Sequence, residues 1–414
     1  MDKRVVVTGI GVVSPIGIGK EEFTNNLFSG YNAADRISRF DVTGYRTQIA
    51  CEVRGFDVKK YIDPKEARGM DLFAQYAYAA AKMAFEDARY PLKERNPDAA
   101  IIIGTGIGGI GTVEEQKGKL LTNPRRSKAV SVRLAQKIMP NSPAGYVSKN
   151  FHINGRSKAV STACATSADA LVDGIMEIEL GDYNVVVAGG AEAAIAPLAI
   201  SSFANMGAMP SNYNDKPKSA SRPFDKDRAG FIMGDGSGIV ILELLEHAVE
   251  RDARIYAEII GYGCTSDAYD MVKPDPSGLG AQEAMQKSIK MAGLQPRDID
   301  YINAHATSTP EGDPIEVNAI RQVFGEHAKR LAISSTKSMT GHLLGAAGSI
   351  EFITCLLAIE NKMAPPTINL DNPIDEELNF VPNKSLPLEI NVAINNNFGF
   401  GGHNTVLVLK RYLD

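Results

Sequence analysis

Short runs rich in Val and Ile alternate along this chain with segments of helical periodicity, and this alternation restricts the fold more than any other feature. Runs of this kind are typical of buried strands. The expected strands lie at residues 4–8, 100–103, 184–188, 238–242, 256–260, 331–334 and 392–395. The expected helices lie at residues 71–87, 166–180, 281–292 and 347–360. Strands that alternate with helices predict a layered α/β fold.

A weak internal repeat indicates two similar halves. Cys164 precedes the helical segment ATSADALVDGIMEIELGD, and later the glycine-rich turn around His342 precedes an apolar helix. Each half would therefore place a reactive residue at the start of a helix. A chain of 414 residues that is 44% hydrophobic can form two domains or one duplicated unit. We expect the halves to be residues 1–255 and 256–414.

Charge and cysteine content narrow the class of protein. The formal net charge is −5 and no long Lys/Arg tract occurs, which disfavours nucleic acid and membrane surfaces as partners. The four cysteines are widely spaced without a CxxC pair, as expected for reduced thiols in a cytosol. The amino terminus enters a β-like segment at once, and no apolar run reaches membrane-spanning length. We therefore expect a cytoplasmic protein.

The stretch VSTACATS, residues 160–167, places Cys164 among small and hydroxyl side chains. We expect a strand that ends at Ser161 or Thr162 and a helix that begins near Ala165. Unpaired N–H groups and the positive dipole end at such a helix start would favour the thiolate, which suits a nucleophile. A lone cysteine beside alanines can instead be a small buried hydrophobic residue. We assign that role to the other cysteines.

Two of the six histidines lie in loops rich in small and polar residues. His305 is in NAHATSTPEGD and His342 is in STKSMTGHLLGAAGS, and both loops follow expected strand ends. In α/β folds such positions hold ligands and catalytic groups. Lys337 follows a buried strand, so we expect a partly enclosed charge there.

Two glycine-rich stretches allow more than one interpretation. NNNFGFGGHN, residues 395–404, indicates a backbone with positive φ or close to a ligand, or a plain hairpin. GTGIGG, residues 104–109, fits the GxGxxG pattern of nucleotide-binding oxidoreductases. However, no second strand with a terminal acidic residue follows at the βαβ distance, so we disfavour a nucleotide site.

Taken together, these motifs resemble one family, the β-ketoacyl-acyl-carrier-protein synthases, and especially the type II elongation enzyme. The resemblance also includes VVVTGIGVVSPIG, KEARGMDLFAQYA and SRPFDKDRAGFIMGDGSG, so it extends over almost the whole chain. It implies the thiolase fold, in which two pseudo-symmetric βαβαβαββ halves form a five-layered αβαβα sandwich. It also implies a dimer.

The resemblance implies a Cys-His-His site for the condensation of two thioesters. Cys164 would take an acyl group from an acyl carrier protein, with an oxyanion hole made by the backbone N–H groups of Cys164 and Phe400. His305 and His342 would bind the carbonyl of a malonyl thioester while carbon dioxide leaves. Neither half-reaction requires a metal or redox cofactor, because the phosphopantetheine arm arrives on the carrier protein.

Further roles are also implied by the resemblance. Lys337 and Glu351 would form a charged pair that supports the histidines. The implied substrate contacts are Thr307 and Thr309 for the phosphopantetheine arm, Phe203, Ile107 and Phe400 for the acyl channel, and Phe398 and Gly401 beside them. An acidic carrier protein needs a basic landing site, for which the candidates are Lys65, Arg68, Arg125, Arg126 and Lys128. Each of these could equally be an ordinary solvated charge.

Several positions depart from the family pattern without removing the Cys-His-His residues. Asp270 and Val272 replace a His and a Thr, Ala229 replaces an Asp, Ala306 replaces a Gly, and Gly69 and Gly207 stand where basic residues are common. The departures leave open a specialised polyketide or polyene ketosynthase that acts with a chain-length subunit as a heterodimer. A non-catalytic scaffold would lack the nucleophile, and a degradative thiolase would carry a second cysteine in the C-terminal glycine-rich motif.

Overall fold

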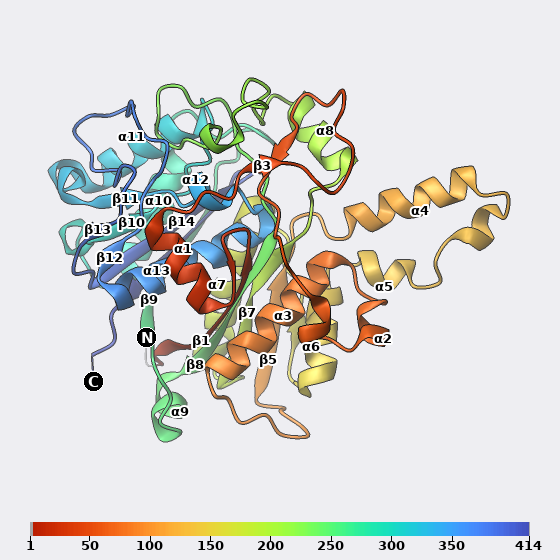
Figure 1. Cartoon of the computed structure of the whole chain (residues 1–414). Helices are drawn as coiled ribbons and strands as arrows, with labels where there is room; N and C mark the ends of the chain where they lie inside the picture. The colour runs from red at the N-terminus through yellow and green to blue at the C-terminus, as the bar shows by residue number, and fades with distance from the viewer. Residues whose placement is uncertain (1–2, 414) are drawn as a thin grey trace.

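The protein, described here over residues 3–413 by a computed structural model, is built on one large mixed sheet (Figure 1). Its strands lie side by side in the order β11-β10-β14-β15-β9-β1-β8-β7-β5-β6, and β2 pairs with β1. In that order the strands are Ala332–Ser334, Tyr301–Asn303, Val392–Gly399, His403–Lys410, Ala257–Ser266, Val5–Ser14, Gly236–Leu244, Val185–Glu192, Ala99–Gly104 and Ser157–Lys158, with β2 at Gly17–Ile18. Two small ribbons, β3–β4 and β12–β13, lie outside this sheet. They span Asp35–Arg36 with Ile49–Ala50, and Met363–Ala364 with Leu386–Pro387.

The sheet contains the same strand pattern twice. From one edge inward, β6, β5 and β7 are parallel and are followed by antiparallel β8 and β1. From the other edge, β11, β10 and β14 are parallel and are followed by antiparallel β15 and β9. The two sets meet where β1 pairs antiparallel with β9. This confirms the two similar halves, and the division near residue 255 stays a prediction.

Thirteen α-helices occur within the described residues, together with short 3₁₀ turns. The helices α1 to α13 are Lys20–Ser29, Pro64–Ala67, Leu72–Asp87, Ile110–Thr122, Leu134–Ile138, Ser142–Phe151, Thr166–Leu180, Pro197–Asn205, Leu245–Glu250, Leu279–Met291, Gly312–Phe324, Lys337–Thr340 and Ala347–Asn361. The turns η1 to η7 are Val58–Lys60, Arg126–Ala129, Ala163–Ala165, Pro217–Ser219, Pro296–Asp298, Gly325–Arg330 and Leu344–Ala346.

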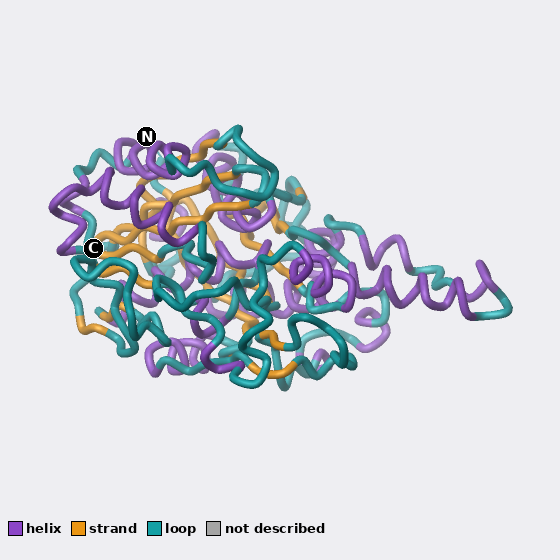
Figure 2. Tube along the Cα trace, turned by 90° about the horizontal axis from the view of Figure 1, so that it is seen from above, coloured by secondary structure: helices purple, strands orange, loops and turns teal. Residues whose placement is uncertain are grey.

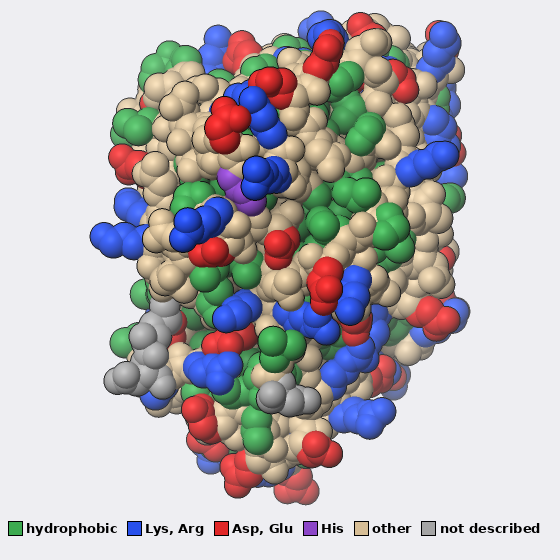
Figure 3. Space-filling model, turned by 90° about the vertical axis from the view of Figure 1, so that its left-hand side faces the viewer, with side chains coloured by type: hydrophobic (Ala, Val, Ile, Leu, Met, Phe, Trp, Pro, Cys, Tyr) green, Lys and Arg blue, Asp and Glu red, His purple; other side chains and the backbone are tan. Residues whose placement is uncertain are grey.

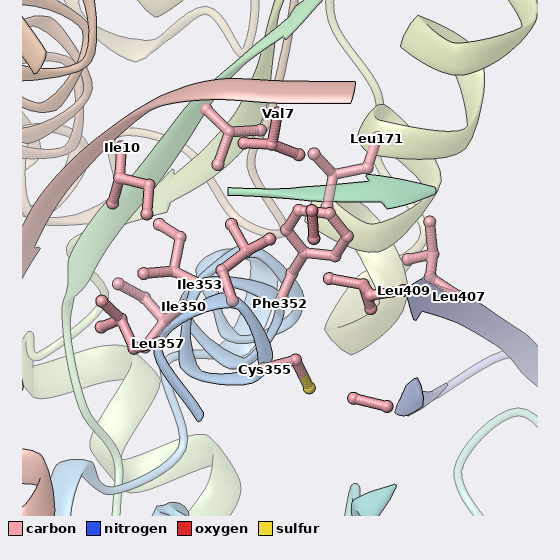
Figure 4. Packing of buried hydrophobic residues seen from close by; sticks show 14 of the residues in the cluster. Val7, Ile10, Leu171, Ile350, Phe352, Ile353, Cys355, Leu357, Leu407 and Leu409 are labelled. Atoms are coloured by element: carbon pink, nitrogen blue, oxygen red, sulfur yellow. The ribbon is translucent and has the colours of Figure 1, made fainter. Parts of the chain in front are cut away.

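Two helices, α7 and α13, form the central layer of the molecule. Phe352 and Ile353 of α13 pack with Leu171 of α7 in one hydrophobic cluster that also includes Val7 of β1 and Leu409 of β15 (Figure 4). Separate clusters join α3 to the outer face of the first half and α10 and α11 to the outer face of the second. The layers therefore follow the order αβαβα, and the chain has the thiolase fold that the sequence predicted.

The sequence of α13 explains its central position. Thirteen of its fifteen residues are buried, because apolar side chains occur all round the helix rather than on one stripe. The stretch Leu344–Asn361 is long and apolar enough to cross a membrane by length and composition, but 89% of it is buried inside the protein. Its apolar character is accounted for by packing between the two halves of the sheet.

All of the expected strands and helices are present, but the segment before Cys164 differs from the prediction. Its strand, β6, ends at Lys158 rather than at Ser161 or Thr162, because it pairs with β5 over only two residues. The backbone then turns at Ala163, whose φ is +50°, into the 3₁₀ turn that carries the cysteine. Helix α7 follows directly.

Helices α4 and α5 project from the body as an arm (Figure 1), and the view from above shows the same projection (Figure 2). Apolar side chains on this arm are exposed, among them Leu121 at 68% and Val132 at 100%. Elsewhere the surface is mixed: on the face shown in Figure 3, acidic and basic side chains intermingle. The arm therefore leaves apolar area uncovered in the single chain.

Candidate active site

Cys164 sits in η3, at the start of the central helix α7. It lines a cavity of about 420 Å³, and His305 and His342 line the same cavity. The positive φ of Ala163 is a conformation that residues other than glycine seldom adopt, so the turn is held by its surroundings. One of these contacts is the Thr166 side chain, which accepts a hydrogen bond from the backbone of Thr162 at 2.8 Å and donates one to Ala163 O at 2.6 Å.

The two histidines face each other at the ends of neighbouring elements. His305 follows β10, and His342 follows the short helix α12. Their ring centroids are 5.5 Å apart and the rings are nearly perpendicular. Burial, followed by the positive charge of Lys337, holds the pKa of each imidazole well below its usual range. Both rings are therefore neutral near pH 7, and each can present one N–H to the cavity.

A buried ion pair supports the histidines from behind. Lys337, only 1% exposed, donates to Glu351 of α13. Burial raises the pKa of Glu351 to about 7, and the adjacent lysine opposes this rise. Neither side chain lines the cavity. The charge of Lys337 acts on both histidines, and Lys337 begins α12, which ends two residues before His342.

The resting cysteine does not show the lowered pKa that its position at a helix start predicted. Burial raises the pKa of the Cys164 thiol to about 12. Lys337 and the backbone N–H of Phe400 lower it, while Glu192 and Glu351 raise it. Loss of water around the sulfur therefore raises the pKa more than Lys337 and the N–H of Phe400 lower it. The cysteine rests as a thiol.

The glycine-rich loop at residues 395–404 is both a hairpin and a close neighbour of the cysteine. It joins β14 to β15, and Gly401 and Gly402 have φ of +84° and +78°. A Cβ on Gly399 would lie 3.1 Å from the backbone nitrogen of Cys164, so a side chain there would press on the nucleophile turn. The backbone N–H of Phe400 lowers the pKa of the Cys164 thiol, so it lies close to the sulfur. The stretch is therefore a hairpin, as one interpretation predicted, and its backbone has positive φ, as the other predicted.

A second loop, which includes Asp267 and Met271, contacts the hairpin beside the cavity. The backbone of Asp267 donates to Gly402 O at 2.9 Å, and its carboxylate accepts from the Asn404 side chain at 2.6 Å. Gly401 N donates to Met271 O at 2.9 Å. Val272, one of the departures from the family pattern, lines the cavity next to this contact. Asp270 is exposed and accepts from the backbone of Val272 and Lys273.

The cavity brings together most of the expected site residues and leaves others outside. Those that line it are Cys164, Phe203, His305, Thr307, Thr309, His342, Phe398 and Phe400. Those that do not are Ile107, Lys337, Glu351 and Gly401. Ile107 is 38% exposed on the chain surface. The basic residues proposed for carrier binding are exposed and lie away from the cavity lining: Lys65, Arg68, Arg125, Arg126 and Lys128.

Buried carboxylates that sequence reasoning did not select hold the His305 loop. Glu316 of α11 accepts from the backbone N–H groups of His305 and Ala306 at 2.9 and 2.7 Å and from the side chain of Asn396 at 3.0 Å. Asp313 accepts from Phe224 N at 2.9 Å. The spacing of three residues between the two acids on one helix, just after the His305 motif, was the available signal.

Family comparison now identifies the chain. The profile described as "Beta-ketoacyl synthase, N-terminal domain" matches residues 2–248, and "Beta-ketoacyl synthase, C-terminal domain" matches residues 256–371. The chain belongs to the β-ketoacyl synthase family. This synthase is therefore an acyltransferase of the condensing class, as the resemblance implied.

Relatives of this β-ketoacyl synthase match it over nearly their full length. The 3-oxoacyl-[acyl-carrier-protein] synthase 2 of Coxiella burnetii is 45% identical, covering 100% of this chain and 99% of the relative. The protein of the same name from Synechocystis sp. is 44% identical, with coverages of 99% and 98%. Among solved structures, one described as "The ishigamide ketosynthase/chain length factor" is 35% identical with a TM-score of 0.92, covering 99% of this chain and 100% of that chain.

Another solved structure shows a type II PKS acyl-carrier protein in complex with its ketosynthase bound to the hexaketide. It is 32% identical to this chain with a TM-score of 0.91, and the match covers 99% of this chain and 100% of that one. The full-length relatives named synthase 2 are thus more similar in sequence than either ketosynthase structure.

Proposed function

We propose that this synthase is a 3-oxoacyl-[acyl-carrier-protein] synthase of fatty acid biosynthesis. It would condense malonyl carried on an acyl carrier protein with an acyl primer held as a thioester on Cys164. The observation that carries the proposal is that Cys164, His305 and His342 line one cavity, with the Lys337–Glu351 pair buried behind them. The full-length relatives of the same name support it.

The first half-reaction loads the primer. The Cys164 sulfur attacks the carbonyl carbon of an acyl thioester, and its proton leaves with the carrier thiol. Because the thiol rests protonated, proton loss accompanies attack. The backbone N–H groups of Cys164 and Phe400 would stabilise the negative oxygen of the tetrahedral intermediate, and the close approach of Gly399 to Cys164 N supports this role.

The second half-reaction forms the carbon–carbon bond. His305 and His342 each donate an N–H to the carbonyl oxygen of the malonyl thioester, which stabilises the enolate as carbon dioxide leaves. The enolate carbon attacks the Cys164 thioester, and the released thiolate takes up one proton. The products are carbon dioxide, free Cys164 and a 3-ketoacyl chain two carbons longer on the carrier. Neutral imidazoles suit this role, because they donate without presenting a competing acid.

This chemistry requires no metal or redox cofactor, because a thioester already activates both carbon centres. The phosphopantetheine arm would enter past Thr307 and Thr309, which line the cavity. Phe203 and Phe400, whose ring centroids are 6.3 Å apart, would contact the acyl chain. Gly401 does not line the cavity and would act on the substrate only by giving the hairpin its turn. Ile107 does not line the cavity either, and it would influence the acyl channel only through neighbouring residues.

We also propose a cytoplasmic homodimer that receives the carrier protein on exposed basic residues. The arm of α4 and α5 supports self-association, because its apolar side chains are uncovered in the single chain. The proposed carrier contacts are Lys65, Arg68, Arg125, Arg126 and Lys128. An acidic carrier would be attracted to these charges more strongly at low salt.

A specialised ketosynthase that pairs with a chain-length subunit is the second candidate. The similarity to the ishigamide ketosynthase/chain length factor favours it, as does the presence of Asp270 and Val272 in the loop beside the cavity. In that case the arm of α4 and α5 would bind the chain-length subunit instead of a second copy of this synthase.

One assay separates the two candidates. Purified chain is mixed with malonyl and acyl carrier proteins that bear saturated, polyunsaturated or aryl primers, and its mass in solution is measured. Efficient extension of saturated primers by a homodimer is the expected result. A monomer that is active only after addition of a second ketosynthase-like chain would support the specialised candidate, and the absence of condensation with every primer would contradict both.

A further inference from the structure

Glu192, at the end of β7, is a fully buried carboxylate that the reaction steps above do not use. Its Oε2 accepts from the N–H of Gly106 at 2.8 Å and from the N–H of Gly345 at 3.1 Å. Its Oε1 accepts from the Thr105 hydroxyl at 3.0 Å and from the N–H of Ile107 at 3.3 Å. Four donors from two distant segments thus converge on one side chain.

These donors come from two segments that flank the nucleophile. Thr105 to Ile107 belong to the GTGIGG stretch between β5 and α4, and a Cβ on Gly106 would lie 3.6 Å from Ala163 O. Gly345 is in η7, and a Cβ there would lie 2.3 Å from Gly106 N and 2.7 Å from Glu192 Oε2. The backbones at Gly106 and Gly345 therefore meet at the Glu192 carboxylate, and a side chain at either glycine would collide with its neighbours.

The contact reaches the cavity wall beside Cys164 through Leu344. This residue precedes Gly345, lines the cavity and packs in one apolar cluster with Cys164 and Phe231. Burial raises the pKa of Glu192 to about 7, and the backbone and hydroxyl donors oppose this rise. A buried charge is tolerated only when such donors satisfy it. Glu192 is thus a carboxylate that would be unfavourable without these donors, and it lies where Gly106 of the first half meets Gly345 of the second half.

We propose that Glu192 is a positioning residue for acyl transfer, which holds the Thr105–Ile107 loop against Gly345 and thereby fixes Leu344 at the wall that receives the alkyl chain of the acyl donor. This inference rests on the proposed function for its substrate. Glu316 holds the backbone of His305, and the backbone of His342 is held separately by hydrogen bonds with Ile232 and Gly234. Glu192 therefore acts on one half-reaction and not on the other.

The test compares Glu192→Gln with Glu177→Gln in the full-length enzyme. Glu177 is also buried on α7, but it pairs with Arg156, outside the cavity. A glutamine at position 192 keeps the size but turns an NH₂ group toward N–H donors. For Glu192→Gln, the KM for a saturated acyl donor in acylation of Cys164 should rise at least about fivefold, while malonyl decarboxylation changes less than about twofold. Glu177→Gln should change neither.

A second readout needs no substrate. The charge of Glu192 raises the pKa of Cys164, so Glu192→Gln should shift the pH profile of iodoacetamide labelling of Cys164 to lower pH. If Glu192→Gln does not fold, Thr105→Val removes one donor and should raise the same KM by about twofold. An unchanged KM with an unshifted labelling profile, or an equal loss of both half-reactions, overturns the proposal. Failure of the unmodified enzyme to condense any primer would instead overturn the proposed function.

Discussion

The two helices of the central layer begin in the same way but carry different chemistry. In the first half, the three-residue turn η3 precedes the fifteen-residue helix α7, and in the second, η7 precedes the fifteen-residue helix α13. The first residue of each turn has a positive φ, +50° at Ala163 and +47° at Leu344. The local backbone is therefore duplicated.

The residues at matching positions of the two turns have different roles. Cys164 is the middle residue of η3, and Gly345 is the middle residue of η7. One turn offers a nucleophile to the cavity, whereas the other offers space for close approach of Gly106 and Glu192. His342 comes two residues before η7, so the second half supplies the imidazole from just outside its turn. The same local backbone thus serves two roles: η3 presents the residue that would form the thioester bond, and η7 makes contacts that support the cavity wall.

The largest expected effect comes from replacing Cys164 in η3, with the buried Cys355 of α13 as the control. Cys164→Ala should reduce condensation by at least about a thousandfold, because no thioester can form, while malonyl decarboxylation persists. Cys355→Ala, in the apolar interior of α13, should leave both activities within about threefold and lower stability by about 1 kcal/mol. Condensation and carbon dioxide release are measured for each variant. Condensation by Cys164→Ala would contradict the nucleophile assignment.

The next largest expected effect is a difference in the free energy of unfolding between variants of a buried ion pair and variants of a more exposed one. Lys337→Met should lower the free energy of unfolding by about 3–5 kcal/mol, because it leaves Glu351 buried without a partner. Arg156→Met, which breaks the pair between the half-exposed Arg156 and Glu177 of α7, should cost less, about 1 kcal/mol, because the arginine stays in contact with solvent. Urea denaturation measures both. A double variant with Glu351→Met as well should recover stability, and equal costs for the two single variants would contradict the comparison.

The matching positions of the turns can also be tested by adding a methyl group. Gly345→Ala should lower the free energy of unfolding by about 1–3 kcal/mol, since its Cβ would lie 2.3 Å from a backbone nitrogen. Gly145→Ala in α6 is the control, because it has open space around it and should be neutral or stabilising by up to about 1 kcal/mol. Thermal unfolding gives both values. A harmless Gly345→Ala would show that the close contact is not needed.

The smallest effect is a shift in pH dependence. Lys337 lowers the pKa of His305 and His342, so these rings stay neutral to a lower pH than they otherwise would. Removing the lysine in the Lys337→Met, Glu351→Met variant should raise both pKa values, and the acidic limb of the decarboxylation profile should move to higher pH. The profile is recorded from pH 5 to 9. Movement to lower pH would contradict the electrostatic role of Lys337.

Local sequence was sufficient for the elements and for the reactive residues. The Val/Ile-rich runs became β1, β5, β7, β8, β9, β11 and β14, because such segments can hardly be placed anywhere but in a buried sheet. Cys164, His305 and His342 were predicted from the small residues and strand ends around them, and they line one cavity. The neighbouring residues in the sequence were enough to predict these three side chains, because each of them lies in a local turn that its neighbours form.

Contacts between distant segments could not be inferred in this way. The expected lowering of the Cys164 pKa was wrong in direction, because burial of the sulfur depends on segments distant in the chain, such as those of Phe231 and Leu344, that pack around it. Glu192 lies in an ordinary strand, and only the folded chain brings Gly106 and Gly345 to its carboxylate. Periodicity and local turns were enough to predict the layers and the reactive groups. Which charges are buried, and what they contact, depends on the folded chain, because desolvation and hydrogen bonding arise where segments far apart in the chain meet.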